Sequence, residues 1–425
     1  DILNEKLDRL LKTLGPGILF ASTAIGVSHL VQSTRAGAEF GFALIAFVML
    51  ANLLKYPFFE YGSRYANVTG TSIIDGYKRL GRNALVLYFL ITIGSMFFVT
   101  AAVGFVTAGF LENLFQIDFL GIWTVVILFI VCAAILTVGK YKALDSLIKI
   151  IASVLVISTV TAFVLAVVNG PVGKVENFEP KIIWDQAGIF FLIALMGWMP
   201  TALDLSSWNS LWTLERIKQT KFRPKLKETL FEFRLAYVIT AVLAFLFVIL
   251  GAYIFFGSGE TLPNNNSLFA HKVVTLYSET IGDWSYIIIA SAAFSVMFGT
   301  IIAVFDGYSR SLGRTIELLF EKKESRVKSY YSKNMYISFI LILAIGSFIV
   351  IFQFGDKLKE LVDVATTISF LIAPVIAVFN FKLVTGKYLE KNYQPPIWLK
   401  VLSYSGIVFL TGFAIFFIVT RFYQI

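Results

Sequence analysis

Residues 196–207 read MGWMPTALDLSS and interrupt an otherwise apolar run. Pro200 has no backbone donor and its ring clashes with the preceding turn of a helix, while Gly197 adds backbone freedom. An earlier stretch, residues 15–35, reads GPGILFASTAIGVSHLVQSTR, with small and polar residues clustered in its middle. Both stretches therefore predict helices that break partway along their length.

The composition predicts that these helices lie in a lipid bilayer. Of the 425 residues, 57% are hydrophobic and 15% are charged, whereas a soluble domain carries about 25% charged residues. A single water-soluble core cannot hide this much apolar surface. The composition excludes a soluble enzyme and a disordered protein. One cysteine, Cys132, and two histidines exclude an intrachain disulfide framework and a Cys- or His-rich metal cluster.

The apolar runs predict eleven membrane-spanning helices, because a spanning helix needs about 20 mostly apolar residues. They are far too long for the strands of a membrane barrel, so the expected class is an all-α integral membrane protein. The expected spans are roughly 14–34, 41–63, 84–111, 119–139, 146–168, 184–212, 235–256, 284–312, 334–353, 361–381 and 398–420. The connection at 257–283 contains the turn cluster Pro263-Asn264-Asn265-Asn266.

The distribution of Lys and Arg between the connecting segments predicts how the chain is oriented in the membrane. With the N-terminus inside, the inner segments carry 27 of these residues and the outer segments carry 7, which is a strong positive-inside signal. We therefore expect a cytoplasmic N-terminus, an extracytoplasmic C-terminus and a bacterial inner membrane. The net charge of +9 is then assigned to cytoplasmic loops and not to nucleic-acid binding.

The two interrupted spans are five spans apart, which predicts an inverted repeat. Five is an odd number, so the second group of five must cross the bilayer in the opposite direction. We expect one transmembrane domain over 1–425, with a first repeat at about 14–168, a second at about 184–381 and an extra helix at about 398–420. In such folds the solute site lies between the broken helices.

Several scaffold motifs resemble those of the Nramp (natural resistance-associated macrophage protein) family of divalent-metal transporters. They are Ala36-Gly37-Ala38-Glu39-Phe40-Gly41-Phe42, Ala51-Asn52-Leu53-Leu54, Val68-Thr69-Gly70, Tyr141-Lys142-Ala143-Leu144-Asp145 and Met199-Pro200. The resemblance covers nearly the whole chain. It implies a LeuT-like fold of ten core helices plus one, and secondary-active transport of a metal cation by alternating access.

The expected site departs from the family pattern. The family's Asp-Pro-Gly-Asn motif aligns with Gly26-Val27-Ser28-His29, so its carboxylate is lost. Met199 is kept, while the family's two histidines in the sixth helix become Thr201 and Ser206. Residues 91–110 contain no Asp, Glu or His, so the family's acidic proton path is absent. Any metal site is therefore non-standard.

The residues expected to bind substrate lie at the two interruptions. They are Gly26, Ser28, His29, Met196, Gly197, Trp198, Met199 and Thr201. His29 is either a ligand or proton acceptor, or a neutral side chain bonded to freed carbonyls. Met199 is either a thioether ligand for a soft metal or apolar lining. Trp198 would stack on an organic solute or plug the cavity.

The residues expected to couple or gate transport are Asp204, Asp306, Arg310, Thr366 and Thr367. Asp204 is either a relocated carboxylate or the second half of a Thr201–Asp204 capping box. Asp306 and Arg310, four residues apart on one helix face, form a gate or a self-neutralising pair. The two threonines would line the path or bond their own helix. Lys55 is expected to snorkel to the cytoplasmic end of its span.

Three hypotheses follow. The first is a metal-cation transporter with a non-standard site containing His29 and Met199. The second is the same scaffold carrying a small, amino-acid-like organic solute. The third, a non-transporting sensor, is disfavoured because loss of transport would not require two interrupted helices to persist. No resident cofactor is expected apart from a transported divalent metal or a coupling proton or sodium ion. An enzyme is not expected, because the sequence contains no phosphate loop or dense metal-ligand motif.

Overall fold

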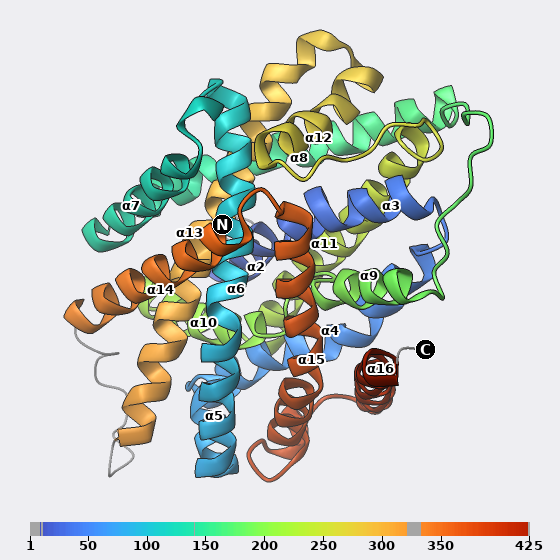
Figure 1. The fold of residues 1–425 in the computed structure, drawn as a ribbon. Coiled ribbons are helices and arrows are strands. Elements are labelled where there is room, and N and C mark those ends of the chain that lie inside the picture. Colours follow the sequence, from blue (N-terminus) through green and yellow to red (C-terminus); the bar gives the residue numbers. More distant parts are fainter. Residues whose placement is uncertain (1–8, 10–11, 140, 321–332, 424–425) are drawn as a thin grey trace, which may run out of the picture.

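The computed structural model describes residues 9, 12–139, 141–320 and 333–423. Within those residues every regular element is helical (Figure 1). The first half contains α2 (Pro16–Ala24), the π-helix η1 (Ser28–Ser33), α3 (Thr34–Phe40), α4 (Ile45–Thr69), α5 (Ile73–Leu80), α6 (Arg82–Phe115), η2 (Asp118–Leu120), α7 (Ile122–Val138) and α8 (Tyr141–Asn169). The second half contains α9 (Gln186–Gly197), α10 (Leu205–Thr220), α11 (Leu226–Ile254), α12 (Asn266–Ile281), η3 (Asp283–Ser285), α13 (Tyr286–Phe320), α14 (Lys333–Phe354), α15 (Leu358–Thr385), η4 (Lys391–Tyr393) and α16 (Ile397–Tyr423).

Seven helical segments of the described chain are long and apolar enough to cross a membrane. Two further apolar helices, α7 and α9, are shorter. Each of the eleven expected spans coincides with a helix or, at 14–34 and 184–212, with a pair of broken helices. The helical class is therefore confirmed, while the count of eleven spans stays a prediction.

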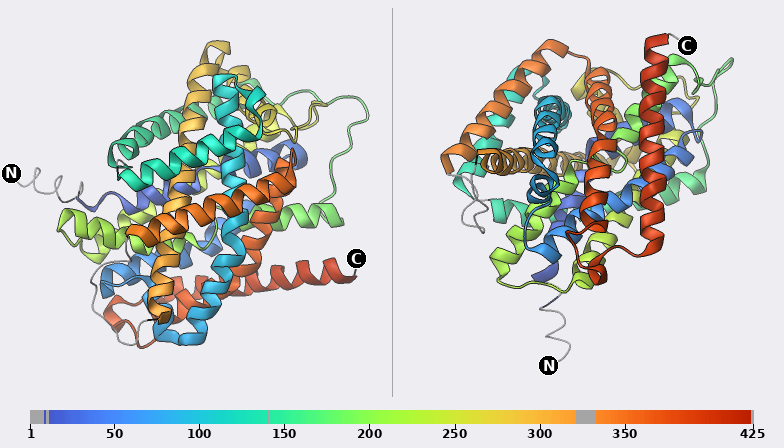
Figure 2. Two further views of the ribbon diagram at one scale, coloured as in Figure 1. Left: turned by 60° about the vertical axis from the view of Figure 1, so that its left-hand side comes forward. Right: turned by 90° about the horizontal axis from the view of Figure 1, so that it is seen from below.

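The helices form an inner and an outer set. In the most apolar windows of α11 and α15, 61% of the residues are buried inside the protein, against 22% for α8, α14 and α16. Figure 2 shows α16 along the outside of the bundle. Large apolar side chains of the outer helices are exposed, for example Ile345 of α14 and Val408 of α16. An outward apolar face of this kind suits contact with lipid tails.

One connection differs from the expectation. The segment 257–283, expected only to connect two spans through a turn cluster, contains α12. Asn265 caps this helix, since its side chain accepts a hydrogen bond from the backbone N–H of Leu268 at 3.0 Å. Phe269 and Tyr277 on α12 are fully buried. The turn cluster of asparagines is thus a helix start and not the middle of a loop.

Both predicted interruptions are present. Helix α2 ends at Ala24, and the chain passes through Ile25 and Gly26 before η1 begins at Ser28. Helix α9 ends at Gly197, and α10 begins at Leu205 after the link 198–204. The Met199–Pro200 peptide bond within this link is cis. The breaks leave backbone groups without partners in their own helices, so the surroundings must satisfy them.

Candidate transport site

A narrow gap separates the two interruptions. Its walls come from α2 and η1, the link 198–204, α6, α10 and α13, and consist mostly of apolar side chains: Thr23, Ala24, Val27, Ser28, Val99, Val103, Trp198, Thr201, Ala202, Leu205, Trp208, Thr300 and Val304. The free space is about 20 Å³, which is room for about one water molecule. The gap is therefore closed to any larger solute in this conformation.

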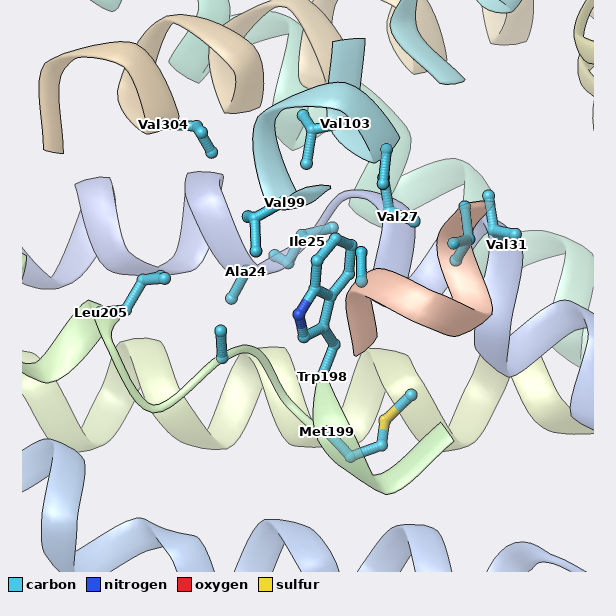
Figure 3. Close-up of a cluster of buried hydrophobic side chains, with 14 of the residues drawn as sticks. Ala24, Ile25, Val27, Val31, Val99, Val103, Trp198, Met199, Leu205 and Val304 are labelled. Atoms are coloured by element: carbon cyan, nitrogen blue, oxygen red, sulfur yellow. The ribbon is translucent and has the colours of Figure 1, made fainter. Parts of the chain in front are cut away.

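Trp198 closes the gap. Its indole rises from the link 198–204 toward Ile25 and Val27, as Figure 3 shows. Only 4% of the residue is exposed, and its Nε1–H donates to Ser369 Oγ on α15 at 2.8 Å. The contact fixes the ring, because a buried indole N–H needs an acceptor. The two roles expected for Trp198, stacking on a solute and plugging the cavity, both stay predictions.

Lys55 reaches the second interruption from α4. The side chain is fully buried, and its Nζ donates to the carbonyl oxygens of Met196, Gly197 and Thr201, each at 3.0 Å. The expectation that Lys55 snorkels to the cytoplasmic end of its span is therefore wrong. The physical reason is that carbonyls at the end of α9 have lost their helical donors and attract a positive charge.

His29 lies on η1, and both of its ring nitrogens are engaged. Nδ1 is 2.7 Å from Ser28 Oγ, and Nε2 is 2.8 Å from the carbonyl oxygen of Thr240 on α11. The residue is fully buried. The ring is thus bonded to a helix carbonyl of α11. A metal would have to displace one of these two contacts.

Met199 contacts η1, the helix that follows the first interruption. Its side chain leaves the link in another direction from Trp198 (Figure 3), and its sulfur accepts from Ser33 Oγ at 3.9 Å. His29 and Met199 therefore bind different neighbours, α11 and η1. Within the described residues, no group of three or more His, Cys, Asp or Glu side chains is placed to hold a metal ion.

The small residues at the breaks are required by close packing. A Cβ on Gly197 would lie 1.9 Å from the carbonyl oxygen of Thr366 on α15. A Cβ on Gly26 would lie 2.9 Å from Thr300 Oγ1 on α13. Ser28 Oγ donates to the carbonyl oxygen of Ala24 at 2.6 Å and so satisfies the end of α2. Gly197 thus has a packing role in addition to the backbone freedom expected from the sequence.

Asp204 does not form the expected capping box. It stands at the N-cap of α10, but its backbone is already helical and its side chain makes no cap bond. The carboxylate instead points away, with Oδ2 at 3.4 Å from Ser95 Oγ and from Tyr308 Oη. Oδ1 has no hydrogen-bond partner among the described residues. A buried carboxylate oxygen without a donor is costly.

Asp306 and Arg310 form the expected pair. Arg310 Nε donates to both carboxylate oxygens of Asp306 at 2.8 Å. Trp212 and Tyr336 also donate to this carboxylate, at 3.2 and 2.6 Å. The charge of Asp306 is thus neutralised and hydrogen-bonded locally, as expected for a self-neutralising pair. Its gating role stays a prediction.

The two threonines of α15 differ. Thr366 Oγ1 donates to the carbonyl oxygen of Val362 at 2.8 Å, as a membrane threonine often does, and accepts from Gln32 at 3.3 Å. Thr367 is buried, and its hydroxyl has no partner among the described residues. Thr366 therefore links α15 to η1 directly.

A polar cluster joins α3 to α15, and it was missed by reasoning from the sequence. Arg35 donates to Asp363 through both of its terminal nitrogens, Nη1 and Nη2, at 2.7 and 2.9 Å. Gln32 donates to the same carboxylate at 3.0 Å. Arg35 also lies over the ring of Phe191, 4.7 Å from its centroid. The sequence signal for this cluster is a pair of opposite charges, Arg35 and Asp363, at the edges of the first and tenth expected spans.

Comparison with known proteins places this geometry in a family. The model of the natural resistance-associated macrophage protein-like (Nramp) family matches residues 17–420. An uncharacterized protein of Pasteurella multocida is 36% identical over 95% of this chain and 91% of its own. The divalent metal cation transporter MntH of Latilactobacillus sakei is 22% identical over 96% of this chain and 89% of its own.

Solved structures agree with the fold. The manganese transporter of Eremococcus coleocola, solved as its H236A mutant, superposes with a TM-score of 0.73 at 14% identity. The match covers 97% of this chain and 88% of that one. The described helices therefore form a LeuT-like transporter fold, and the apolar segments are those of an integral membrane protein. The chain belongs to the Nramp family of membrane transporters.

Proposed function

We propose that this protein is a secondary-active transporter that works by alternating access, its cargo crossing between the links after α2 and α9. The proposal includes two inverted repeats, at about 14–168 and 184–381. It also includes eleven spans in a bacterial inner membrane, with the N-terminus on the cytoplasmic side. It is supported by the two interruptions, which face each other, because unwound backbone at membrane depth is tolerated where it lines a cavity and not where it faces lipid. It is also supported by the Nramp family membership.

The geometry best supports a small organic solute as cargo. The carrying observation is that the Lys55 ammonium is bonded to the carbonyl oxygens of the second interruption. A divalent cation prefers carboxylate and other oxygen ligands and is repelled by a nearby ammonium. The gap itself is lined mainly by apolar side chains and a few hydroxyls, which is the usual character of an organic-ligand site. Trp198 must move aside for such a solute to enter.

A metal cation is the second candidate, and the family comparisons favour it. Relatives that match over nearly the whole chain are named divalent metal cation transporters. In this chain such a cation would have to use freed carbonyl oxygens and the open oxygen of Asp204. His29 and Met199 would join it only after leaving Ser28, Thr240 and Ser33.

Asp204 is the residue we assign to coupling. It is a buried carboxylate with one oxygen unpaired among the described residues and hydroxyls from α6 and α13 beside the other. Proton uptake and release there would change the charge beside the second interruption. Because Asp204 makes no cap bond, Asp204→Asn is expected to leave the start of α10 in place while abolishing the effect of a pH gradient.

Uptake into proteoliposomes tests the function. Manganese, cadmium and magnesium are compared with a panel of amino acids and nucleobases, with and without an inward pH gradient. Saturable organic uptake without metal uptake supports the first candidate, and the reverse result supports the second. Asp204→Asn is compared with Asp283→Asn, the same change at an exposed position. If every solute and ion stays outside wild-type liposomes under all gradients, the transporter proposal is rejected.

A further inference from the structure

The protonation state of Lys55 follows from its contacts. Its Nζ lies 3.0 Å from each of three carbonyl oxygens, and all three can only accept. A neutral amine has two N–H donors, so one oxygen would face a lone pair. An ammonium has three donors and no acceptor. The positively charged form therefore has a donor for each of the three oxygens.

The three oxygens form a carbonyl cradle, defined here as the carbonyl oxygens of Met196, Gly197 and Thr201. Two of them end α9 and the third belongs to the link after it. They converge on one point at the negative end of the α9 dipole. Backbone carbonyls that converge in this way replace the hydration shell of a monovalent cation. The cradle thus has the chemistry of a cation site.

The charge balance identifies the kind of cation. Asp204 belongs to the same link as Thr201, and both Asp204 and Lys55 are buried. Lys55 supplies one positive charge to a site that otherwise contains one carboxylate and neutral carbonyls. Removing it would leave a single uncompensated negative charge, which is strongly destabilising. A monovalent cation restores neutrality, whereas a divalent cation leaves an excess charge.

We infer that the carbonyl cradle is a monovalent-cation site that the chain fills with its own ammonium from α4, so that the second interruption is held together without a bound ion. Lys55 comes from a position 141 residues before Met196, and its stem crosses the buried interior. Replacing Lys55 by a small neutral residue therefore opens the site to a sodium-sized ion.

The test uses the purified full-length chain in detergent. The melting temperature is measured in NaCl, KCl and choline chloride at equal ionic strength. Wild type is expected to melt at the same temperature in all three. Lys55→Ala is expected to melt lower in choline chloride, and NaCl should raise its melting temperature saturably, by about 3 °C or more. Manganese chloride should give no larger rise at matched ionic strength.

Two variants separate a cation site from a simple helix cap. Lys55→Met keeps the length of the stem and blocks the space, so its loss of stability should not be recovered by sodium. Lys391→Ala removes an exposed lysine and should respond to no salt specifically. If Lys55→Ala cannot be purified, Lys55→Ser, which also leaves the space beside the three carbonyls open, is measured in the same salts.

The outcomes decide the inference independently of transport. Equal melting of Lys55→Ala, or of Lys55→Ser where it replaces Lys55→Ala, in sodium and choline chloride would overturn it, and so would equal recovery of Lys55→Met by sodium. Absence of uptake by wild-type liposomes would reject the transporter proposal but leave a sodium recovery of Lys55→Ala intact. The two failures are therefore distinguishable.

Discussion

Arg35 and Asp363 form a bidentate ion pair, with N–O distances of 2.7 and 2.9 Å, that joins the end of the first interrupted helix to α15. Their side chains are 6% and 12% exposed. Gln32 binds the same carboxylate, so the pair is satisfied on both sides. A pair of this kind holds η1 and α3 against α15 and must break if these helices separate during transport.

Asp363→Asn is expected to loosen this contact. Removing one partner of a buried ion pair costs roughly 3–5 kcal/mol of unfolding free energy, because the remaining charge is left uncompensated. Arg35 keeps a weaker contact with Glu39 at 3.6 Å, so the lower end applies. Maleimide labelling of Thr367→Cys, in a Cys132→Ser background, should become faster in Asp363→Asn.

The control for this prediction is Asp283→Asn, which changes an exposed carboxylate in the same way. It should leave both the labelling rate and the melting temperature unchanged. Unaltered labelling in Asp363→Asn would mean that the ion pair does not restrict separation of α3 from α15.

Gly197→Ala is expected to destabilise the protein by about 1–3 kcal/mol, the usual cost of overpacking. The added methyl would lie 1.9 Å from the carbonyl oxygen of Thr366, and a backbone atom cannot rotate away. Gly94→Ala on α6 is the matched control, because nothing lies within 4 Å of its Cβ. The control should gain about 0.5–1 kcal/mol from the helix preference of alanine. Similar melting temperatures for the two variants would contradict the close approach of α9 and α15.

Trp198 and Ser369 are expected to be energetically coupled. Trp198→Phe removes the N–H that donates to Ser369 at 2.8 Å, and Ser369→Ala removes the acceptor at a cost of about 1 kcal/mol. A double-mutant cycle should give a coupling energy of about 0.5 kcal/mol or more. Strictly additive losses would show that the indole is positioned by packing alone.

Gly26→Asp restores the carboxylate that the family motif has at this position, but Thr300 obstructs it. The new Cβ would lie 2.9 Å from Thr300 Oγ1 and 3.1 Å from its Cγ2. Thr300→Ala removes both atoms and frees the carbonyl oxygen of Ser22, to which Thr300 donates at 3.0 Å. Calorimetric titration should detect manganese binding by Gly26→Asp/Thr300→Ala.

Wild type and the uncharged counterpart Gly26→Asn/Thr300→Ala should bind less manganese than this double variant. Equal affinity of the Asp and Asn variants would mean that the carboxylate at position 26 contributes nothing to metal binding.

The sequence alone was sufficient to predict the class of fold and the positions of both interruptions. These depend on local chemistry: apolar runs of spanning length, the missing donor of Pro200 and the small residues around Gly26. Each acts within a few residues, so its effect can be read without knowing the neighbours. The family motifs added the LeuT-like scaffold.

The partners of the buried charges and of the site side chains were decided by the tertiary structure. Lys55 binds a carbonyl 141 residues away, and Arg35 binds a carboxylate 328 residues away. The sequence placed Lys55 at a membrane surface because snorkelling is the usual solution for a lone lysine. The spacing of Thr201 and Asp204 allows a cap as well as a relocated carboxylate, yet the helical backbone of Asp204 turns its carboxylate toward α6 and α13. Local sequence determines where a helix must end, but only the packing of distant helices determines which group satisfies the ends.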